Sequence, residues 1–201
     1  KYQAIKQGLM HDLFTRGIDV NTGKLRPTVQ EAPELYKESA LGLIPRDWSL
    51  KKFSKILDIT TGNKDTQDRV DNGKYPFYVR SQKVERINSF SFDGIGILTA
   101  GDGVGTGKVF HFVNGKIAIH QRVYLLYNFK TGIIPEYVYE YFKLNFIHRV
   151  EKYSAKNTVD SVRLEMISEM LIPISEEQEK ISKILININD NIQTEQQDLA
   201  K

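Results

Sequence analysis

The sequence predicts an α+β fold, in which one globular domain has a twisted, mostly antiparallel sheet and short helices. A short helix precedes this domain and a long helix of the coiled-coil type follows it. Short apolar segments separated by turns fill the middle of the chain, which is typical of antiparallel strands. Apolar residues at steps of three and four mark helices at both ends. With 201 residues, 40 % of them apolar, the chain is long enough for one domain with a core and an appendage.

The N-terminal segment, residues 1–17, is predicted to be the end of a helix. Its apolar residues Ile5, Leu9 and Leu13 recur at steps of four, as they do along one side of a helix. Gly17 stands where a C-cap glycine ends a helix. The segment is therefore expected to be the tail of a longer helix and not the start of a domain.

The next segment, residues 18–40, is predicted to be an extended linker, because it contains Pro27 and Pro33 and shows no periodic pattern. The globular domain is expected at residues 41–174. It would begin with an apolar cluster around Trp48, the single tryptophan of the chain.

The middle of the chain is predicted to form short strands. The predicted strands are residues 77–79, 96–99, 108–113, 117–119 and 123–127. Turns are predicted at residues 71–73, at residues 92–94 and at Asn114-Gly115. Because Asn-Gly favours the two-residue turns of hairpins, Asn114-Gly115 predicts a hairpin between the strands on either side.

The last third of the chain is predicted to be mainly helical. The predicted elements are a helix at residues 135–148, a loop at 151–157, a short helix at 162–170, an edge strand at 171–174 and a helix at 175–201. Pro135 suits the first position of a helix. Ser175 and Gln178 have the spacing of a capping box, which marks the start of the last helix.

The C-terminal helix carries a narrow apolar seam among Asn and Gln residues. The seam consists of Ile181, Leu185, Ile188, Ile192 and Leu199, in a single heptad phase. Joined end to end, the chain continues this phase into the N-terminal helix, which suggests that it comes from a longer protein with an internal repeat. Because so polar a helix is not stable alone, a partner helix is expected. The alternative is an amphipathic helix that folds back onto its own domain.

Charge is unevenly distributed along the chain. Residues 60–163 contain 15 Lys and Arg against 10 Asp and Glu, whereas residues 164–201 contain 3 against 8. The middle of the chain can therefore approach a polyanion, and the C-terminal helix is better suited to a protein partner.

Several classes of protein are not supported by the sequence. The chain has no cysteine, which excludes disulfides and thiolate metal sites. It has no apolar run of about 18 residues that would span a bilayer, and no signal peptide is visible. A cytoplasmic location without a membrane partner is expected.

Residues 101–108 resemble a phosphate-binding loop but do not fit one. Asp102 stands where the first glycine is required, and Val109 stands where a Ser or Thr should follow the lysine. The four histidines lie in separate segments, so no metal site is expected. No motif for a nucleophile is present. No catalytic residue and no cofactor are predicted.

Polar loops between the strands contain the side chains that contact nucleic-acid bases and phosphates. The predicted DNA-binding residues are Lys64, Thr66, Gln67, Arg80, Ser81, Gln82, Lys83, Thr106, Lys108, His120, Gln121, Arg122, Lys156 and Asn157. Any single loop of this kind is more often exposed to solvent without binding a ligand. The prediction of DNA binding therefore depends on the presence of several such loops.

Three segments resemble the specificity subunit of type I restriction-modification systems. They are Ile172-Pro173-Ile174 followed by Glu176-Glu177-Gln178, then Gly8-Leu9-Met10 with Asp12-Leu13-Phe14, and Leu43-Ile44-Pro45 with Trp48. The resemblance covers the whole chain. Its most specific parts are the two helical ends.

This resemblance implies a target-recognition domain at residues 41–174 between spacer helices, at 1–17 and 175–201, that pack as a coiled coil. Such a subunit recognises one half of a bipartite site in double-stranded DNA with each domain and is not itself catalytic. The implied partners are the modification (methyltransferase) subunits, the restriction subunit through the complex, and a second copy if half-subunits form a homodimer. Whether the chain is a fragment or a natural half-size subunit is left open. The alternatives are the recognition domain of a fused DNA methyltransferase and an oligomeric scaffold without a DNA role.

Overall fold

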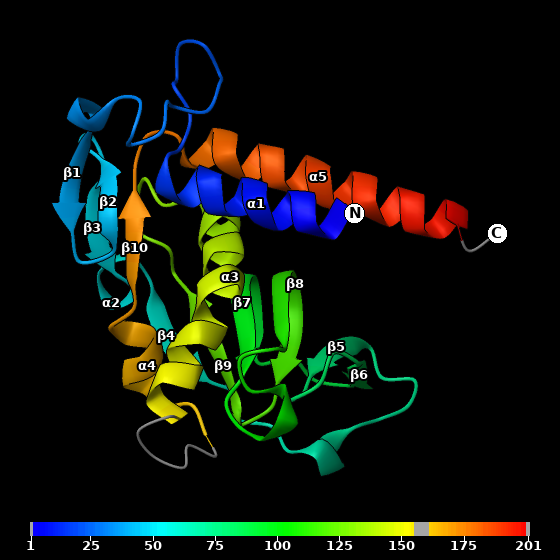
Figure 1. The fold of residues 1–201 in the computed structure, drawn as a ribbon. Coiled ribbons are helices and arrows are strands. Elements are labelled where there is room, and N and C mark those ends of the chain that lie inside the picture. Colours follow the sequence, from blue (N-terminus) through cyan, green and yellow to red (C-terminus); the bar gives the residue numbers. More distant parts are fainter. Residues whose placement is uncertain (1, 155–160, 200–201) are drawn as a thin grey trace. The chain divides into compact units, whose positions relative to one another are not determined.

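The computed structural model describes residues 2–154 and 161–199 and has the predicted α+β class (Figure 1). The chain folds into two compact units. Unit 1 combines both ends of the chain, Lys1–Lys51 and Leu171–Lys201, and unit 2 is the stretch between them, Lys52–Met170. Each unit is described by itself.

Unit 1 consists of two long helices, short strands and a single 3-10 turn. Its elements are α1 (Tyr2–Thr15), η1 (Pro33–Leu35), β1 (Tyr36–Ser39), β2 (Gly42–Pro45), β3 (Ser49–Lys52), β10 (Leu171–Ile174) and α5 (Gln178–Leu199). β1 and β2 form an antiparallel hairpin, and β3 pairs with β10. The helices α1 and α5 pack side by side and run in opposite directions (Figure 1). The two helical ends of the chain are thus partners within one unit.

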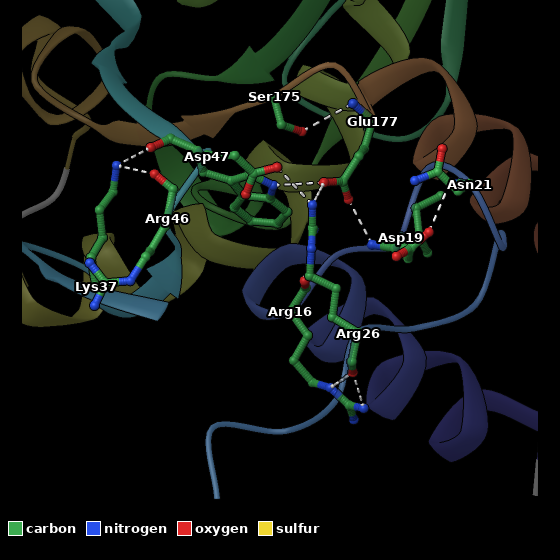
Figure 2. A network of polar contacts seen from close by, with 11 residues as sticks. Arg16, Asp19, Asn21, Arg26, Lys37, Arg46, Asp47, Ser175 and Glu177 are labelled. Atoms are coloured by element: carbon green, nitrogen blue, oxygen red, sulfur yellow. Dashed lines mark hydrogen bonds and ion pairs between the residues drawn. The ribbon is translucent and has the colours of Figure 1, made fainter. Parts of the chain in front are cut away.

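A buried carboxylate, that of Glu177, joins three separate segments of unit 1 (Figure 2). Its Oε1 accepts a hydrogen bond from Trp48 Nε1 at 2.9 Å and lies 2.5 Å from Arg26 Nη2. Its Oε2 accepts a hydrogen bond from the Ile18 backbone N–H at 2.6 Å. Arg26 also bonds to Asp47, 2.8 Å away. The start of α5, the end of α1 and the segment before β3 therefore meet at one charged group.

Residues 18–40, predicted to be an extended linker, are part of unit 1. Ile18 forms a β-bridge with Leu25, and the carboxylate of Asp19 accepts two backbone N–H bonds in the turn between them. The side chains of Ile18 and Tyr36 are buried. The turn residues that indicated a linker instead let the chain fold back on itself.

Unit 2 is built on a six-stranded sheet with the strand order β4-β9-β7-β8-β5-β6. Its elements are α2 (Phe53–Ile56), β4 (Asp58–Thr61), η2 (Thr66–Asp68), β5 (Tyr75–Tyr78), β6 (Val84–Ile87), β7 (Phe92–Ala100), η3 (Gly103–Gly105), β8 (Phe110–Ile119), β9 (Val123–Tyr127), α3 (Pro135–Ser154) and α4 (Leu164–Ser168). β5 and β8 are parallel, and every other neighbouring pair is antiparallel. This confirms the mostly antiparallel sheet.

The core of unit 2 contains an aromatic cluster between α3 and the strands. Phe142 on α3 packs against Phe53, Phe110 and Phe146, with ring centroids 4.5 to 5.5 Å apart. The two ends of unit 2 are also joined, because the Phe53 N–H donates to the Met170 carbonyl at 2.9 Å.

The hairpin predicted at Asn114-Gly115 is wrong. β8 runs through both residues, with Asn114 opposite Ile95 and Gly115 opposite Gly94 in the β7–β8 ladder. The chain reverses instead in the longer loop 101–109. Asn-Gly favours a tight turn only when no long partner strand is present, and here β7 is continuous along the same length. The turn predicted at residues 92–94 lies inside β7 for the same reason.

The last third of the chain is close to the prediction, with shifted ends. α3 begins at Pro135 as predicted but extends to Ser154, so it includes the start of the predicted loop 151–157; the rest of that loop lies outside the described residues. Before α5, Ser175 Oγ accepts the backbone N–H of Glu177 at 3.2 Å, one residue earlier than a capping box requires. In the part of the chain that the structure describes, no helix has both the length and the apolar content of a membrane span.

Candidate nucleic-acid interface

Four loops of unit 2 are joined by backbone hydrogen bonds, and together they are called the polar loops: residues 62–68, 79–83, 101–109 and 120–122. Backbone bonds connect them to one another or to a strand that leads into one of them. Gln121 N–H donates to the Lys64 carbonyl (2.8 Å), Gly101 N–H to the Arg122 carbonyl (2.8 Å), and His120 N–H to the Tyr78 carbonyl (3.0 Å). Segments far apart in the sequence thus present their side chains on one surface.

At the centre of the polar loops, two arginines share one carboxylate. Arg80 Nη1 lies 2.6 Å from Asp102 Oδ1, and Arg122 Nη1 lies 2.7 Å from Asp102 Oδ2. Burial opposes ionisation of Asp102, but the hydrogen bonds and charges of both arginines outweigh it and hold the pKa of Asp102 below its usual value. The same contacts raise the pKa of Arg122. The centre is ionised at neutral pH and has one net positive charge.

The side chains of Arg80 and Arg122 are 43 % and 62 % exposed, whereas that of Asp102 is 14 % exposed. A guanidinium held by a carboxylate on one side keeps its other N–H donors in a fixed plane. The carboxylate therefore orients the two arginines before any ligand binds. Asp102, Arg80 and Thr66 also line a cavity of about 330 Å³.

His120 has a supporting position. Its side chain is buried, its ring stacks on Phe77, and its Nδ1 accepts the backbone N–H of Arg122 at 3.0 Å. Burial, followed by the charge of Arg80, lowers the pKa of His120. The neutral imidazole therefore shapes the loop that carries Arg122 and does not present its ring to the surface.

A second cavity of about 520 Å³ is lined by the last residues of the loop 101–109 and by α3. Lys108, Lys143 and Gln82 line it, and Gln82 Nε2 donates to the Lys108 carbonyl at 3.3 Å. Lys143 Nζ stands 5.0 Å from the centre of the Tyr139 ring. Burial raises the pKa of Tyr139 to about 12, so its hydroxyl stays neutral. The Lys143 ammonium also lies 3.7 Å from the Glu140 carboxylate. Lysine ammonium groups beside an aromatic ring suit a phosphate better than a base edge.

The other predicted DNA-binding residues have different environments. Gln121 donates to Asp65 at 2.6 Å, which joins two of the polar loops, and Gln67 lies on η2 in the first of them. Ser81 Oγ donates to the Lys83 carbonyl, and the Lys83 ammonium is exposed, 3.2 Å from Glu85. The hydroxyl Oγ1 of Thr106 is buried, with no hydrogen-bond partner among the described residues. Lys156 and Asn157 lie outside the described residues.

Two residues of this surface were not predicted from the sequence. In the sequence, Asp102 stands out only as a residue that does not fit a phosphate-binding loop. Its partners Arg80 and Arg122 are 22 and 20 residues away, so the sequence spacing does not indicate the cluster. Lys143 lies on a helix whose pattern indicated packing. An acidic residue inside a glycine-rich loop of a basic segment was the available signal for Asp102.

The apolar seam of α5 is partly covered within unit 1. Ile181 and Leu185 are fully buried, and Ile188 and Ile192 are half-buried. The side chain of Leu199 lies outside the described part. On α1, Leu13 and Phe14 are buried as well. The neighbouring α1 thus supplies a partner for α5.

Comparisons with known proteins all point to one family. The family described as "Type I restriction modification DNA specificity domain" matches residues 45–201. The type I restriction enzyme EcoDI specificity subunit of Escherichia coli is 32 % identical over 85 residues, which cover 42 % of this chain and 18 % of that protein.

Solved structures share the fold. The S subunit of a type I restriction-modification system from M. genitalium superposes with a TM-score of 0.72 at 14 % identity, over 99 % of this chain and 50 % of that one. The HsdS subunit from Thermoanaerobacter tengcongensis gives a TM-score of 0.59 at 12 % identity, over 96 % and 44 %. The chain spans about half the length of these structures or less.

Proposed function

The chain belongs to the type I restriction modification DNA specificity domain family, and from this premise we propose that it recognises one half of a bipartite sequence in double-stranded DNA. The observation that carries the proposal is the centre formed by Arg80, Asp102 and Arg122. It places two oriented guanidinium groups on an exposed surface of unit 2, which is the more basic of the two units.

The chemistry of this centre suits the major groove. An arginine that bonds in bidentate fashion to O6 and N7 of guanine makes the commonest base-specific contact. A preoriented guanidinium loses less rotamer entropy on binding, so more of the contact energy appears as affinity. In this proposal Arg80 and Arg122 contact bases, and Lys108 and Lys143 in the second cavity contact phosphates and set the register.

Unit 1 has a different role in this proposal. The antiparallel pair of α1 and α5 serves as the spacer that sets the distance to a second recognition unit, which another domain or a second copy of the chain supplies. The modification (methyltransferase) subunit docks along residues 176–191, at the start of the C-terminal helix, and the restriction subunit joins through the complex. The chain itself acts as a non-catalytic specificity component.

The proposal is tested by selecting bound duplexes from a random DNA pool. We expect enrichment of one short sequence, with an affinity that falls as salt rises because phosphate contacts release counterions. Replacing residues 52–170 by the corresponding unit of a relative should change the enriched sequence. A chain that enriches no sequence and shows no salt dependence would contradict the proposal, and an unchanged sequence after replacement would assign recognition to another part.

Lys83→Ala is expected to weaken binding to all DNA sequences by a similar factor. Lys83 is exposed and its ammonium forms a surface ion pair with Glu85, so its loss should not unfold unit 2. If its ammonium contacts a phosphate, the slope of log K against log salt should become shallower by about 0.9. Lys55→Ala, at an exposed lysine outside the polar loops, is the control and should leave the slope unchanged. An unchanged slope for Lys83→Ala would remove this residue from the interface.

A further inference from the structure

Val104 is exposed to an unusual degree. Its exposed fraction is 99 %, whereas the next most exposed large apolar residue among those described, Leu164, reaches 50 %. It is the middle residue of η3, in the loop between β7 and β8. A single exposed apolar side chain is ordinary, so its surroundings decide whether this one matters.

The loop that carries Val104 is fixed on both sides. On one side, Asp102 is held by two arginines. On the other, Gly105 packs so closely that a Cβ there would lie 2.6 Å from the Arg80 carbonyl oxygen. The Gly105 carbonyl accepts the N–H of Val109 at 2.9 Å. Gly103 has a φ of +73°, which favours glycine. The backbone therefore presents the isopropyl group of Val104 outward from a constrained position.

The neighbours of Val104 indicate what it contacts. Val104 lines the same cavity as Arg80 and Asp102, so a duplex bound by the arginines meets the valine as well. A valine has no hydrogen-bonding group for a phosphate or a base edge. The apolar group that the major groove offers is the C5-methyl of thymine. Side chains that wedge between base steps are usually longer or planar, such as Phe, Leu, Ile, Met or Pro.

We propose that Val104 is a specificity-determining residue that packs against the C5-methyl of a thymine adjacent to the base pairs contacted by Arg80 and Arg122. This inference rests on the proposed function. It adds a preference for thymine that comes from an apolar contact and not from a hydrogen bond. Burial of one methyl group against the valine corresponds to about a fourfold gain in affinity.

The test uses the whole chain and the duplex that it selects from a random pool. Each thymidine of that duplex is replaced in turn by deoxyuridine, which removes only the methyl group. For the wild-type chain, one replacement should weaken binding about fourfold. For Val104→Ala the same replacement should weaken binding by a smaller factor than for wild type, because alanine keeps only one methyl group, and Val104→Ile should restore the full sensitivity. Val20→Ala, at an exposed valine of unit 1, is the matched control and should behave as wild type.

The outcomes separate this inference from the proposed function. The wild-type chain could select a sequence while every deoxyuridine replacement changes the binding of the wild-type chain and of Val104→Ala by the same factor. In that case the thymine contact is overturned and DNA recognition stands. If Val104→Ala weakens all duplexes equally and abolishes an increase in the fluorescence of 2-aminopurine placed in the site, the valine is a wedge and the proposal is also overturned. If the wild-type chain selects no sequence, both fail together.

Discussion

Glu177→Gln is expected to destabilise unit 1 by about 3 kcal/mol, the low end of the range for breaking a buried ion pair. The carboxylate of Glu177 is 1 % exposed and accepts from three partners, Trp48, Ile18 and Arg26. An amide keeps one acceptor oxygen, but its NH₂ group would face an N–H donor and leave it without a partner. Arg26 retains its contact with Asp47, which is why the low end of the range applies.

Unfolding in urea, followed by the fluorescence of Trp48, measures this effect. Trp48 is the only tryptophan and lies in unit 1, so its signal reports on that unit. Glu179→Gln is the matched control, because the Glu179 side chain is 65 % exposed and pairs only with Lys183 one turn further along. The control should leave the unfolding midpoint close to that of wild type, because an exposed ion pair contributes little to stability. Equal midpoints for the two variants would mean that the buried carboxylate does not hold the three segments together.

Arg122→Ala is expected to weaken binding to the selected DNA sequence roughly tenfold to a hundredfold, as for the loss of a bidentate contact to a base. Binding to unrelated DNA should fall much less. The side chain of Arg122 is exposed, and Arg80 remains to balance the charge of Asp102. Unit 2 should therefore keep its stability, so the loss would reflect recognition and not unfolding.

Arg122→Lys separates geometry from charge in this experiment. The lysine keeps the positive charge but lacks the planar fork of donors. We expect the salt dependence of binding to stay near that of wild type while the preference for the selected sequence is lost. Arg46→Ala, at an exposed arginine of unit 1, should leave both unchanged. If Arg122→Ala retains the wild-type preference, Arg122 does not contact a base.

The helices at the chain ends could be predicted because periodicity and caps are local signals. The seam of α5 is visible in the sequence, and the structure adds that α1 of the same unit packs against this helix. The hairpin at Asn114-Gly115 failed because a local turn preference was outweighed by a long partner strand. Competition between local and distant pairing is not encoded in a short segment.

The candidate interface, too, could be predicted from the sequence in part. Arg80 and Arg122 were named from residue type alone, because guanidinium groups in polar loops suit DNA. Their contact with Asp102 is not visible in the sequence spacing, because the fold brings the three residues together. Likewise, nothing local shows that the ring of His120 is buried against Phe77.

The interruption of unit 1 by unit 2 has a consequence for the order of folding. β3 and β10 pair with each other but flank the whole of unit 2, so their pairing closes a loop of more than a hundred residues. Closing such a loop in an unfolded chain costs about 4 kcal/mol of entropy. Folded unit 2 removes that cost, because the bond between Phe53 and Met170 already holds its ends together. The order with the lower entropic cost is therefore that unit 2 folds first and the pairing of β3 with β10 in unit 1 follows.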